Sequence, residues 1–216
     1  PTTEAVDYYL SNGFARTGER TWSAAEVPAA AAPFQPIALR LLDRQLETGF
    51  RTAPTSSMGR LFDAVSSLLG VCHRSGYEAQ AAMELEALTR GVAADRRYFF
   101  SLAPGTGDAR LLADPAPVLR GMAEDLLSGA SPASVAASFH VAIADLVAEM
   151  AAAARDRTGV GTVALTGGVF LNARLTHECR SALTERGLEV LVHRRVPPSD
   201  AGIALGQVAV LAHRLG

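Results

Sequence analysis

The sequence predicts an α/β protein that is rich in helices and has a small mixed sheet. In the last third of the chain a short apolar run is followed by a helical pattern, a second apolar run and a final helical pattern. This β-α-β-α order with short connections requires parallel strands and a right-handed crossover. Upstream, the aromatic run 98–102 can pair with 110–113 across a turn rich in Pro and Gly. Most of the remaining chain has apolar residues at helical spacing, which predicts helices.

Each predicted element has its own signals. Residues 55–70 begin with Ser and Thr, which are good helix caps, carry apolar side chains at helical spacing and end at Gly70. Ser131 followed by Pro132 marks another helix start, because Pro is favoured at the first helical position. Helices are expected over 3–14, 35–50, 55–70, 75–88, 115–127, 131–154, 171–185 and 201–215, and the last two strands over 162–165 and 188–193.

Composition and charge exclude several classes of function. With 216 residues and 49% hydrophobic content, the chain can form one large domain or two small lobes. The 20 basic residues are all Arg and are balanced by 22 acidic residues, so the net charge of −2 gives no reason to expect nucleic acid as a partner. The absence of Lys excludes a lysine nucleophile and a P-loop lysine.

The cysteines and the beginning of the chain indicate its setting. Cys72 and Cys179 are the only cysteines and lie far outside C-x-x-C spacing, which favours a reducing, cytoplasmic setting. No apolar run is expected to reach the ~20 residues of a membrane span, and no signal peptide is predicted, so we expect no membrane contact. Because the chain begins with Pro1 rather than Met, we expect a processed chain or an excised part of a larger one.

The stretch 162–172 is the strongest candidate for a binding site. A short strand ends at Leu165, Gly167 and Gly168 form a tight turn, and a helical pattern follows. Adjacent glycines let the backbone approach a ligand, and the N–H groups at a helix start favour phosphate. A tight turn without a ligand gives the same pattern, because neither a Walker lysine nor G-x-G-x-x-G spacing is present.

Asn172 and Asp200 extend this candidate site. Both residues fall just past the carboxyl ends of the two predicted parallel strands. Open α/β sheets bind ligands at that edge. Asp200 is also placed to cap the last helix, a role that would need no ligand.

Gly59 and Asp63 form a second candidate. A glycine early in a helix costs roughly 1 kcal/mol relative to alanine, so either a ligand approaches the backbone at Gly59 or another helix packs closely there. Asp63 lies four residues later on the same face and can hydrogen-bond a group that rests on the glycine. The alternative for Asp63 is a surface acid that is solvated or paired with Arg. His140 and Cys179 are expected to be packing residues.

Four blocks of the sequence resemble the hydrogenase-maturation carbamoyltransferase family, HypF. They are Thr55–Val65, Tyr77–Glu86, Thr166–Asn172 and Pro197–Gln207. More distantly, Gly-Gly-Val-x-x-Asn followed by Asp200 resembles the threonylcarbamoyl-transfer enzymes of tRNA modification. The resemblance implies a lobe of the actin/sugar-kinase/heat-shock-chaperone (ASKHA) fold. Residues 55–216 would then be the C-terminal lobe of the carbamoyl-transfer domain, and 1–54 an N-terminal helical connector.

The resemblance also implies a reaction. HypF-like proteins make carbamoyl adenylate from carbamoyl phosphate and ATP, and then pass the carbamoyl group to the C-terminal cysteine of the partner HypE in nickel–iron hydrogenase maturation. The domains that bind carbamoyl phosphate and ATP are missing from this chain. The acceptor brings its own nucleophile, so the resemblance implies a carbamoyltransferase that needs no catalytic thiol here.

Site residues follow from the matching blocks. The resemblance implies that Gly59 and Asp63 contact the nucleotide or acyl group, that Gly167 and Gly168 contact the phosphate, and that Asn172 contacts the sugar or neighbouring polar atoms. It makes Glu78 a weaker candidate for substrate binding. Asp200 would be a ligand of a divalent metal, either Fe, Zn or Mg.

The sequence departs from the family in two respects. The family's metal site also uses a His-x-x-x-His pair, which the five histidines do not form. The family usually has Gly where this chain has Ala79. We therefore expect the isolated fragment to be incomplete as an enzyme. Two alternatives stay open: a non-catalytic nucleotide-binding or interaction module, and a small-molecule O-carbamoyltransferase with a hydroxyl acceptor.

Overall fold

The computed structural model describes residues 41, 44–45, 47–50, 55–105 and 111–215. The chain divides into two compact units, residues 1–142 and 143–216, and the division falls inside the long helix α7 (Pro132–Thr158). The helix predicted over 3–14 lies outside the described residues, as does most of the helix predicted over 35–50. The domain boundary expected after residue 54 also falls there and stays a prediction.

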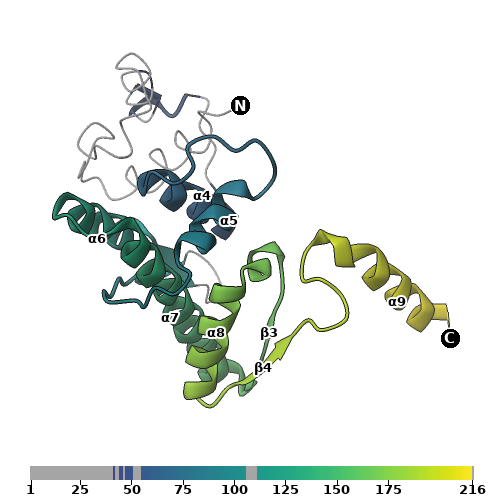
Figure 1. Ribbon diagram of the computed structural model, residues 1–216. Coiled ribbons are helices and arrows are strands. Elements are labelled where there is room, and N and C mark those ends of the chain that lie inside the picture. Colours follow the sequence, from purple (N-terminus) through teal and green to yellow (C-terminus); the bar gives the residue numbers. More distant parts are fainter. Residues whose placement is uncertain (1–40, 42–43, 46, 51–54, 106–110, 216) are drawn as a thin grey trace. The chain divides into compact units, whose positions relative to one another are not determined.

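The first unit combines helices with an antiparallel strand pair. In chain order its elements are α4 (Met58–Leu68), α5 (Gln80–Leu88), β1 (Ser101–Pro104), β2 (Leu111–Asp114), α6 (Ala116–Leu127) and the beginning of α7 (Figure 1). In the strand pair, Ser101 lies opposite Asp114. The predicted pairing is therefore confirmed, with both strands slightly further along the chain than expected.

Helix α4 shows how this unit forms its core. Ser57 caps the helix by accepting a 3.4 Å hydrogen bond from the N–H of Arg60. Gly70, at φ +71°, follows the end of the helix, as predicted. The buried ring of Phe62 lies 5.1 Å from the ring of Phe139 in α7, edge to face. Burial of such a side chain contributes about 1.5–3 kcal/mol, so this contact fastens α4 to α7.

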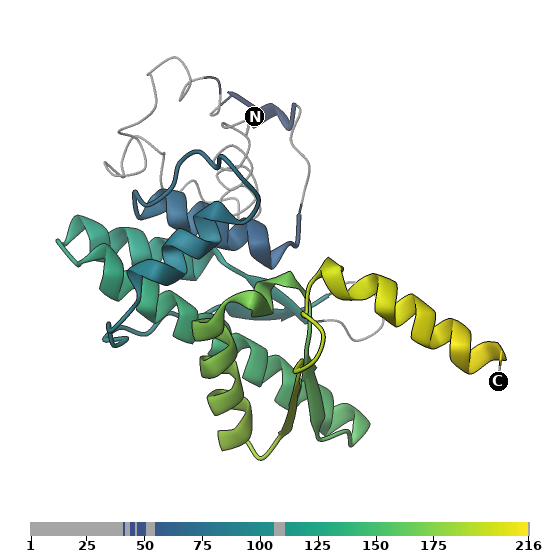
Figure 2. The same ribbon diagram turned by 45° about the vertical axis from the view of Figure 1, so that its right-hand side comes forward.

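The second unit is built around two parallel strands. Besides the end of α7, it contains β3 (Thr162–Leu165), the 3-10 helix η2 (Gly168–Leu171), α8 (Ala173–Glu185), β4 (Glu189–Val192), the 3-10 helix η3 (Asp200–Gly202) and α9 (Ile203–Leu215) (Figures 1 and 2). Thr162 pairs with Glu189 and Leu165 with Val192, which confirms the predicted parallel order. Within the described ranges the strands form two separate pairs rather than one mixed sheet, since each pair belongs to a different unit.

Helix α8 packs through three residues at helical spacing. Leu175, Cys179 and Leu183 are buried. Gly187, at φ +72°, donates its N–H to the carbonyl oxygen of Thr184 and lets the chain turn into β4. The predicted end of the helix is confirmed, but the helix begins at Ala173 rather than at residue 171 because η2 comes first.

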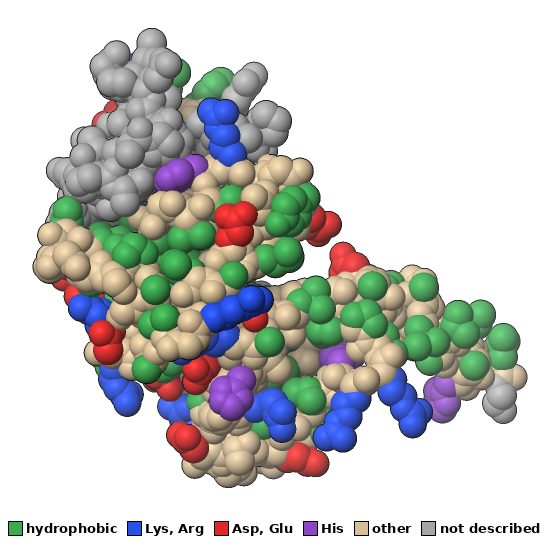
Figure 3. Space-filling view, in the orientation of Figure 1, with side chains coloured by type: hydrophobic (Ala, Val, Ile, Leu, Met, Phe, Trp, Pro, Cys, Tyr) green, Lys and Arg blue, Asp and Glu red, His purple; other side chains and the backbone are tan. Residues whose placement is uncertain are grey.

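The last helix, α9, differs from helices α4 to α8 because none of its residues is buried. It contacts η3, the short turn that precedes it. Figure 3 shows hydrophobic side chains gathered on its visible face.

Helix α7 corrects the expectation that no apolar run is long enough to span a membrane. It has 27 residues and an 18-residue window of mean hydropathy 1.5, so by length and composition it is long and apolar enough to cross a membrane. It is the only such helix in the part of the chain that the structure describes. However, 61% of that window is buried within the protein, which is equally typical of a core helix.

Candidate functional site

The loops that follow β3 and β4 meet at one edge of the strand pair. The backbone N–H of Gly167 donates a 2.8 Å hydrogen bond to the carbonyl oxygen of Pro198. Next to this bond, Thr166 Oγ1 lies 3.0 Å from His193 Nε2. The proximity of the two loops expected from the sequence is therefore confirmed. The ligand roles of their residues stay predictions.

The glycine pair forms a turn with one residue at positive φ. Gly167 has φ +99°, which a residue with a side chain rarely adopts. A Cβ built on Gly167 or on Gly168 would meet no atom of the described residues within 4 Å, so those residues leave space open in front of the turn. The N–H of Gly167 is already bonded to Pro198, which makes Gly168 the better candidate for a phosphate contact through the backbone.

Asn172 is the N-cap of α8. Its Oδ1 accepts a 2.8 Å hydrogen bond from the N–H of Leu175, and the residue is only 8% exposed. The sequence did not predict this cap, although an Asn at a strand-to-helix junction is a recognisable signal. Any contact between Asn172 and a ligand would have to coexist with the cap.

Asp200 lies in the other loop and is exposed. It is the first residue of η3, and Ser199 rather than Asp200 occupies the N-cap position. The predicted capping role of Asp200 is therefore wrong, because a 3-10 turn separates it from α9. The described residues contain no group of three or more His, Cys, Asp or Glu side chains that could hold a metal ion. One carboxylate is not a metal site, so the residues that the structure describes do not by themselves fit a tightly bound metal.

The second candidate pair, Gly59 and Asp63, lies in α4 of the other unit. Asp63 is 6% exposed and forms an ion pair with Arg60, with 2.5 Å between Oδ2 and Nη2. Burial raises the pKa of Asp63, and the positive charge of Arg60 opposes the rise. Of the alternatives for Asp63, pairing with Arg is confirmed, but the carboxylate is buried rather than at the surface. Buried acids with shifted pKa values often mark functional sites.

Gly59 does not serve tight packing within the described chain. A Cβ built on it would meet only Ser57 Oγ, at an ordinary contact distance of 3.6 Å. Close packing of a helix is thus not seen among those residues, and the ligand alternative stays a prediction.

Glu78 and Ala79 lie in the turn before α5. The helix was expected from residue 75 but begins at Gln80, and Glu78 is an exposed turn residue. The reason for the late start is Ala79, which has φ +61° and cannot continue a right-handed helix. The same value explains why a glycine suits this position.

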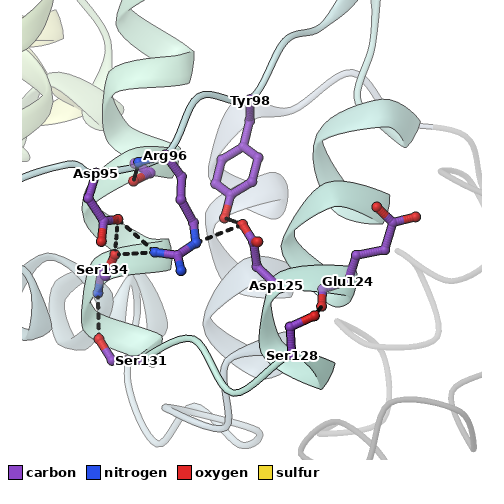
Figure 4. Close-up of polar contacts among 9 residues, drawn as sticks. Asp95, Arg96, Tyr98, Glu124, Asp125, Ser128, Ser131 and Ser134 are labelled. Atoms are coloured by element: carbon purple, nitrogen blue, oxygen red, sulfur yellow. Dashed lines mark hydrogen bonds and ion pairs between the residues drawn. The ribbon is translucent and has the colours of Figure 1, made fainter.

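The structure also shows a polar cluster that the sequence did not predict. The hydroxyl of Tyr98 donates to Asp125 Oδ2 at 2.6 Å, and Arg96 Nε lies 3.0 Å from the same oxygen (Figure 4). Arg96 also pairs with Asp95, which accepts a further hydrogen bond from Ser134. These bonds fasten the segment before β1 to α6 and α7. Apart from the neighbours Asp95 and Arg96, the bonded partners are far apart in sequence, so no local signal indicates the cluster.

His140 and Cys179 are packing residues, as expected. His140 is fully buried, with Nδ1 2.8 Å from the carbonyl oxygen of Ala136 and its ring 5.3 Å from that of Phe62. Cys179 is also fully buried, and burial raises the pKa of its thiol to about 12. A thiol held protonated in this way is a poor nucleophile.

Solved structures define the class of this protein. A crystal structure of full-length HypF in the phosphate- and nucleotide-bound form covers 97% of this chain, with a TM-score of 0.77 and 32% sequence identity. The crystal structure of T. kodakarensis HypF covers 98%, with a TM-score of 0.73 and 28% identity. The chain is thus an α/β lobe of the Kae1-like, ASKHA type, which confirms the predicted fold class.

The family follows from the sequence comparisons. A family model described as the second subdomain of the Kae1-like domain of carbamoyltransferases matches residues 9–207, and the chain belongs to that family. A carbamoyltransferase HypF homolog of Cupriavidus necator is 40% identical over 185 residues, which cover 82% of this chain. Carbamoyltransferase HypF of Rhodobacter capsulatus is 41% identical over 182 residues, which cover 83% of it. The chain spans less than half of these relatives, namely 45% of the first and 23% of the second.

Proposed function

We propose that this chain is the second subdomain of a HypF-like carbamoyltransferase. In this role it helps to hold carbamoyl adenylate while the carbamoyl group passes to the C-terminal cysteine of a HypE-like acceptor. The proposal depends on one observation: the loops 166–168 and 193–200 are hydrogen-bonded to each other at the carboxyl edge of β3 and β4. It is supported by relatives named carbamoyltransferases and by a solved HypF described as phosphate- and nucleotide-bound.

The reaction is an acyl transfer. The bond between the carbamoyl carbon and the phosphate oxygen breaks, a carbon–sulfur bond forms with the acceptor cysteine, AMP leaves, and the thiol proton passes to solvent or a base. Negative charge develops on the carbonyl and phosphate oxygens, and backbone N–H groups stabilise such charge. We assign this stabilisation to the N–H of Gly168; the proposal is supported by the open glycine turn before α8.

Two groups of the chain have limited roles in this proposal. Cys179 is not the nucleophile, because its thiol is buried in α8 and its pKa is raised to about 12. Asp200 is exposed at the end of the second loop and is proposed as one metal ligand; the described residues offer no group of three or more His, Cys, Asp or Glu side chains to complete the site. The cytoplasmic location stays a prediction.

The decisive experiment fills the space in front of the glycine turn. In the complete enzyme, Gly168→Val should fold normally, because a Cβ at Gly168 meets nothing within 4 Å, yet should abolish carbamoyl transfer by occupying the phosphate position. The matched control is Gly161→Val. Gly161 immediately precedes β3, at the end of the strand away from the glycine turn, and a Cβ built there also has open space around it. Transfer is measured by mass spectrometry of the acceptor.

Two outcomes would contradict the proposal. Undiminished transfer by Gly168→Val would show that the glycine turn is not at the nucleotide. Equal loss in Gly161→Val would show that the effect is not specific to this edge. The acceptor is tested separately: transfer to a small hydroxyl compound, but not to a peptide ending in cysteine, would indicate the O-carbamoyltransferase alternative.

A further inference from the structure

The loop after β4 begins with consecutive basic residues beside the glycine turn. His193, Arg194 and Arg195 directly follow the strand, and all of them are exposed. The imidazole Nε2 of His193 lies 3.0 Å from Oγ1 of Thr166, in the loop after β3. This contact holds the basic segment next to the glycine turn, at the carboxyl edge of the strand pair.

The two arginines have no partner of opposite charge among the described residues. Neither guanidinium forms an ion pair or a side-chain hydrogen bond with that part of the chain. Within the loops 166–168 and 193–200, Asp200 is the only acidic residue, so Arg194 and Arg195 give this edge an excess of positive charge. Exposed cations at a binding edge attract an anionic group of a ligand.

The loop that carries the two arginines is held in place by its backbone. Pro197 and Pro198 have fixed φ angles, and the carbonyl oxygen of Pro198 accepts the 2.8 Å hydrogen bond from Gly167. A Cβ built on Gly202 would lie 2.9 Å from the carbonyl oxygen of Pro197, so the chain after the prolines packs directly on them. A loop that is fixed before a ligand binds loses less conformational freedom on binding, which favours affinity.

The acceptor of the proposed reaction carries an anion of the matching kind. A cysteine at the end of a protein chain has a free carboxylate, attached to the carbon next to the one that bears the sulfur. When this sulfur approaches the adenylate, the carboxylate comes close to the phosphate, and the two negative charges repel each other. Guanidinium groups bind carboxylates through paired, charge-assisted hydrogen bonds and would offset that repulsion.

We propose that Arg194 and Arg195 bind the C-terminal carboxylate of the acceptor, and so select a cysteine at the end of a chain over one inside it. The inference rests on the proposed function for the identity of the acceptor. The phosphate of the nucleotide is the competing occupant. That phosphate is assigned to Gly168, which lies in the other loop, so the arginines are left for the carboxylate.

The inference is tested by peptide binding to the complete enzyme. Two dye-labelled peptides have the last residues of a HypE-like acceptor and end in cysteine, one with a free carboxylate and the other with an amide. Fluorescence anisotropy gives the dissociation constant of each peptide. The unmodified enzyme should bind the free acid about tenfold or more tightly than the amide, as expected for hydrogen bonds to a charged group.

Variants then locate the preference. The double variant Arg194→Gln, Arg195→Gln should bind both peptides with the affinity of the amide. The matched control is Arg186→Gln, which removes an exposed arginine between α8 and β4, at the other end of that strand. This control should keep the preference for the free acid. Circular dichroism checks that the variants fold.

Four results would overturn the inference. They are equal affinity of the unmodified enzyme for the two peptides, binding of neither peptide, a preference that the double variant retains, and loss of the preference in the control as well. A double variant that weakens binding of AMP but leaves the peptide preference unchanged would assign the arginines to the phosphate. No carbamoyl donor enters these measurements, so their failure is distinct from a failure of carbamoyl transfer to the acceptor protein.

Discussion

The backbone N–H of Gly167 is hydrogen-bonded to the carbonyl oxygen of Pro198 at 2.8 Å. This bond joins the loop after β3 to the loop after β4 without using a side chain of either loop. Side chains at this edge can therefore be changed without removing that bond between the loops. Loss of activity in a side-chain variant at this edge would therefore indicate mainly a lost contact with a ligand. Loss of stability in a variant that strains the backbone would indicate that the loop has shifted.

Gly202→Ala is expected to destabilise the chain, whereas Gly206→Ala is expected to be neutral or stabilising. The new methyl group at Gly202 would lie 2.9 Å from a backbone oxygen, so the loop must shift, while the one at Gly206 meets nothing within 4 Å. In an exposed helix interior, alanine is favoured over glycine by about 1 kcal/mol. Urea denaturation of both variants checks the signs. A stabilising Gly202→Ala would show that the loop is not tightly packed there.

Asn172→Ala is expected to lower the free energy of unfolding by about 1 kcal/mol, because the cap of α8 is lost. Asn172→Asp keeps an oxygen that can accept from Leu175 and should retain most of that stability. Carbamoyl transfer by the complete enzyme then separates the two possible roles of Asn172. Full transfer by Asn172→Asp would make this residue a cap only, and loss of transfer at normal stability would indicate a ligand contact through the amide.

Ala79→Gly is expected to raise the free energy of unfolding by about 0.5–1 kcal/mol, since glycine adopts positive φ without the strain that a Cβ introduces. The control is Ala87→Gly, on the exposed side of α5, where glycine should destabilise by about the same amount. Chemical denaturation measures both. Destabilisation by Ala79→Gly would contradict the left-handed conformation of this residue, which is φ +61°.

Asp63→Asn is expected to gain stability relative to the wild type as the pH rises. Burial raises the pKa of Asp63 in the folded chain above the ordinary value of 3.8, so over the range above 3.8 the folded state binds more protons than the unfolded state. Wild-type stability therefore falls as the pH rises through the folded pKa, and the Asn variant lacks this loss. Urea denaturation between about pH 4 and about pH 7 measures the difference.

Arg60 supplies the control for that experiment. Its charge opposes the rise in the pKa of Asp63, so Arg60→Gln should make the pH dependence steeper. If Asp63→Asn instead becomes relatively less stable with rising pH, the ion pair outweighs burial and the pKa of Asp63 is lowered.

Local signals account for the predictions that the structure confirms. These signals act on residues within a few positions, so they can be recognised in the sequence alone. They are the Ser57 cap, Pro132 at the start of α7 and the glycines after α4 and α8. The predictions that were wrong depended on less local features. Helix α5 begins late because of the backbone angle at Ala79, and Asp200 does not cap α9 because η3 lies between them.

For the residues that the structure describes, the sequence by itself determined the order of the α-helices and strands, the parallel pairing of the last two strands and the family, because these depend on spacing and on residue types at fixed positions. Only the tertiary structure decided that Asp63 is buried while Asp200 is exposed, that Gly167 is bonded to Pro198 and that α9 is uncovered. Burial, loop contacts and unpartnered surfaces depend on which residues the fold brings together, and residues far apart in the chain leave no local pattern.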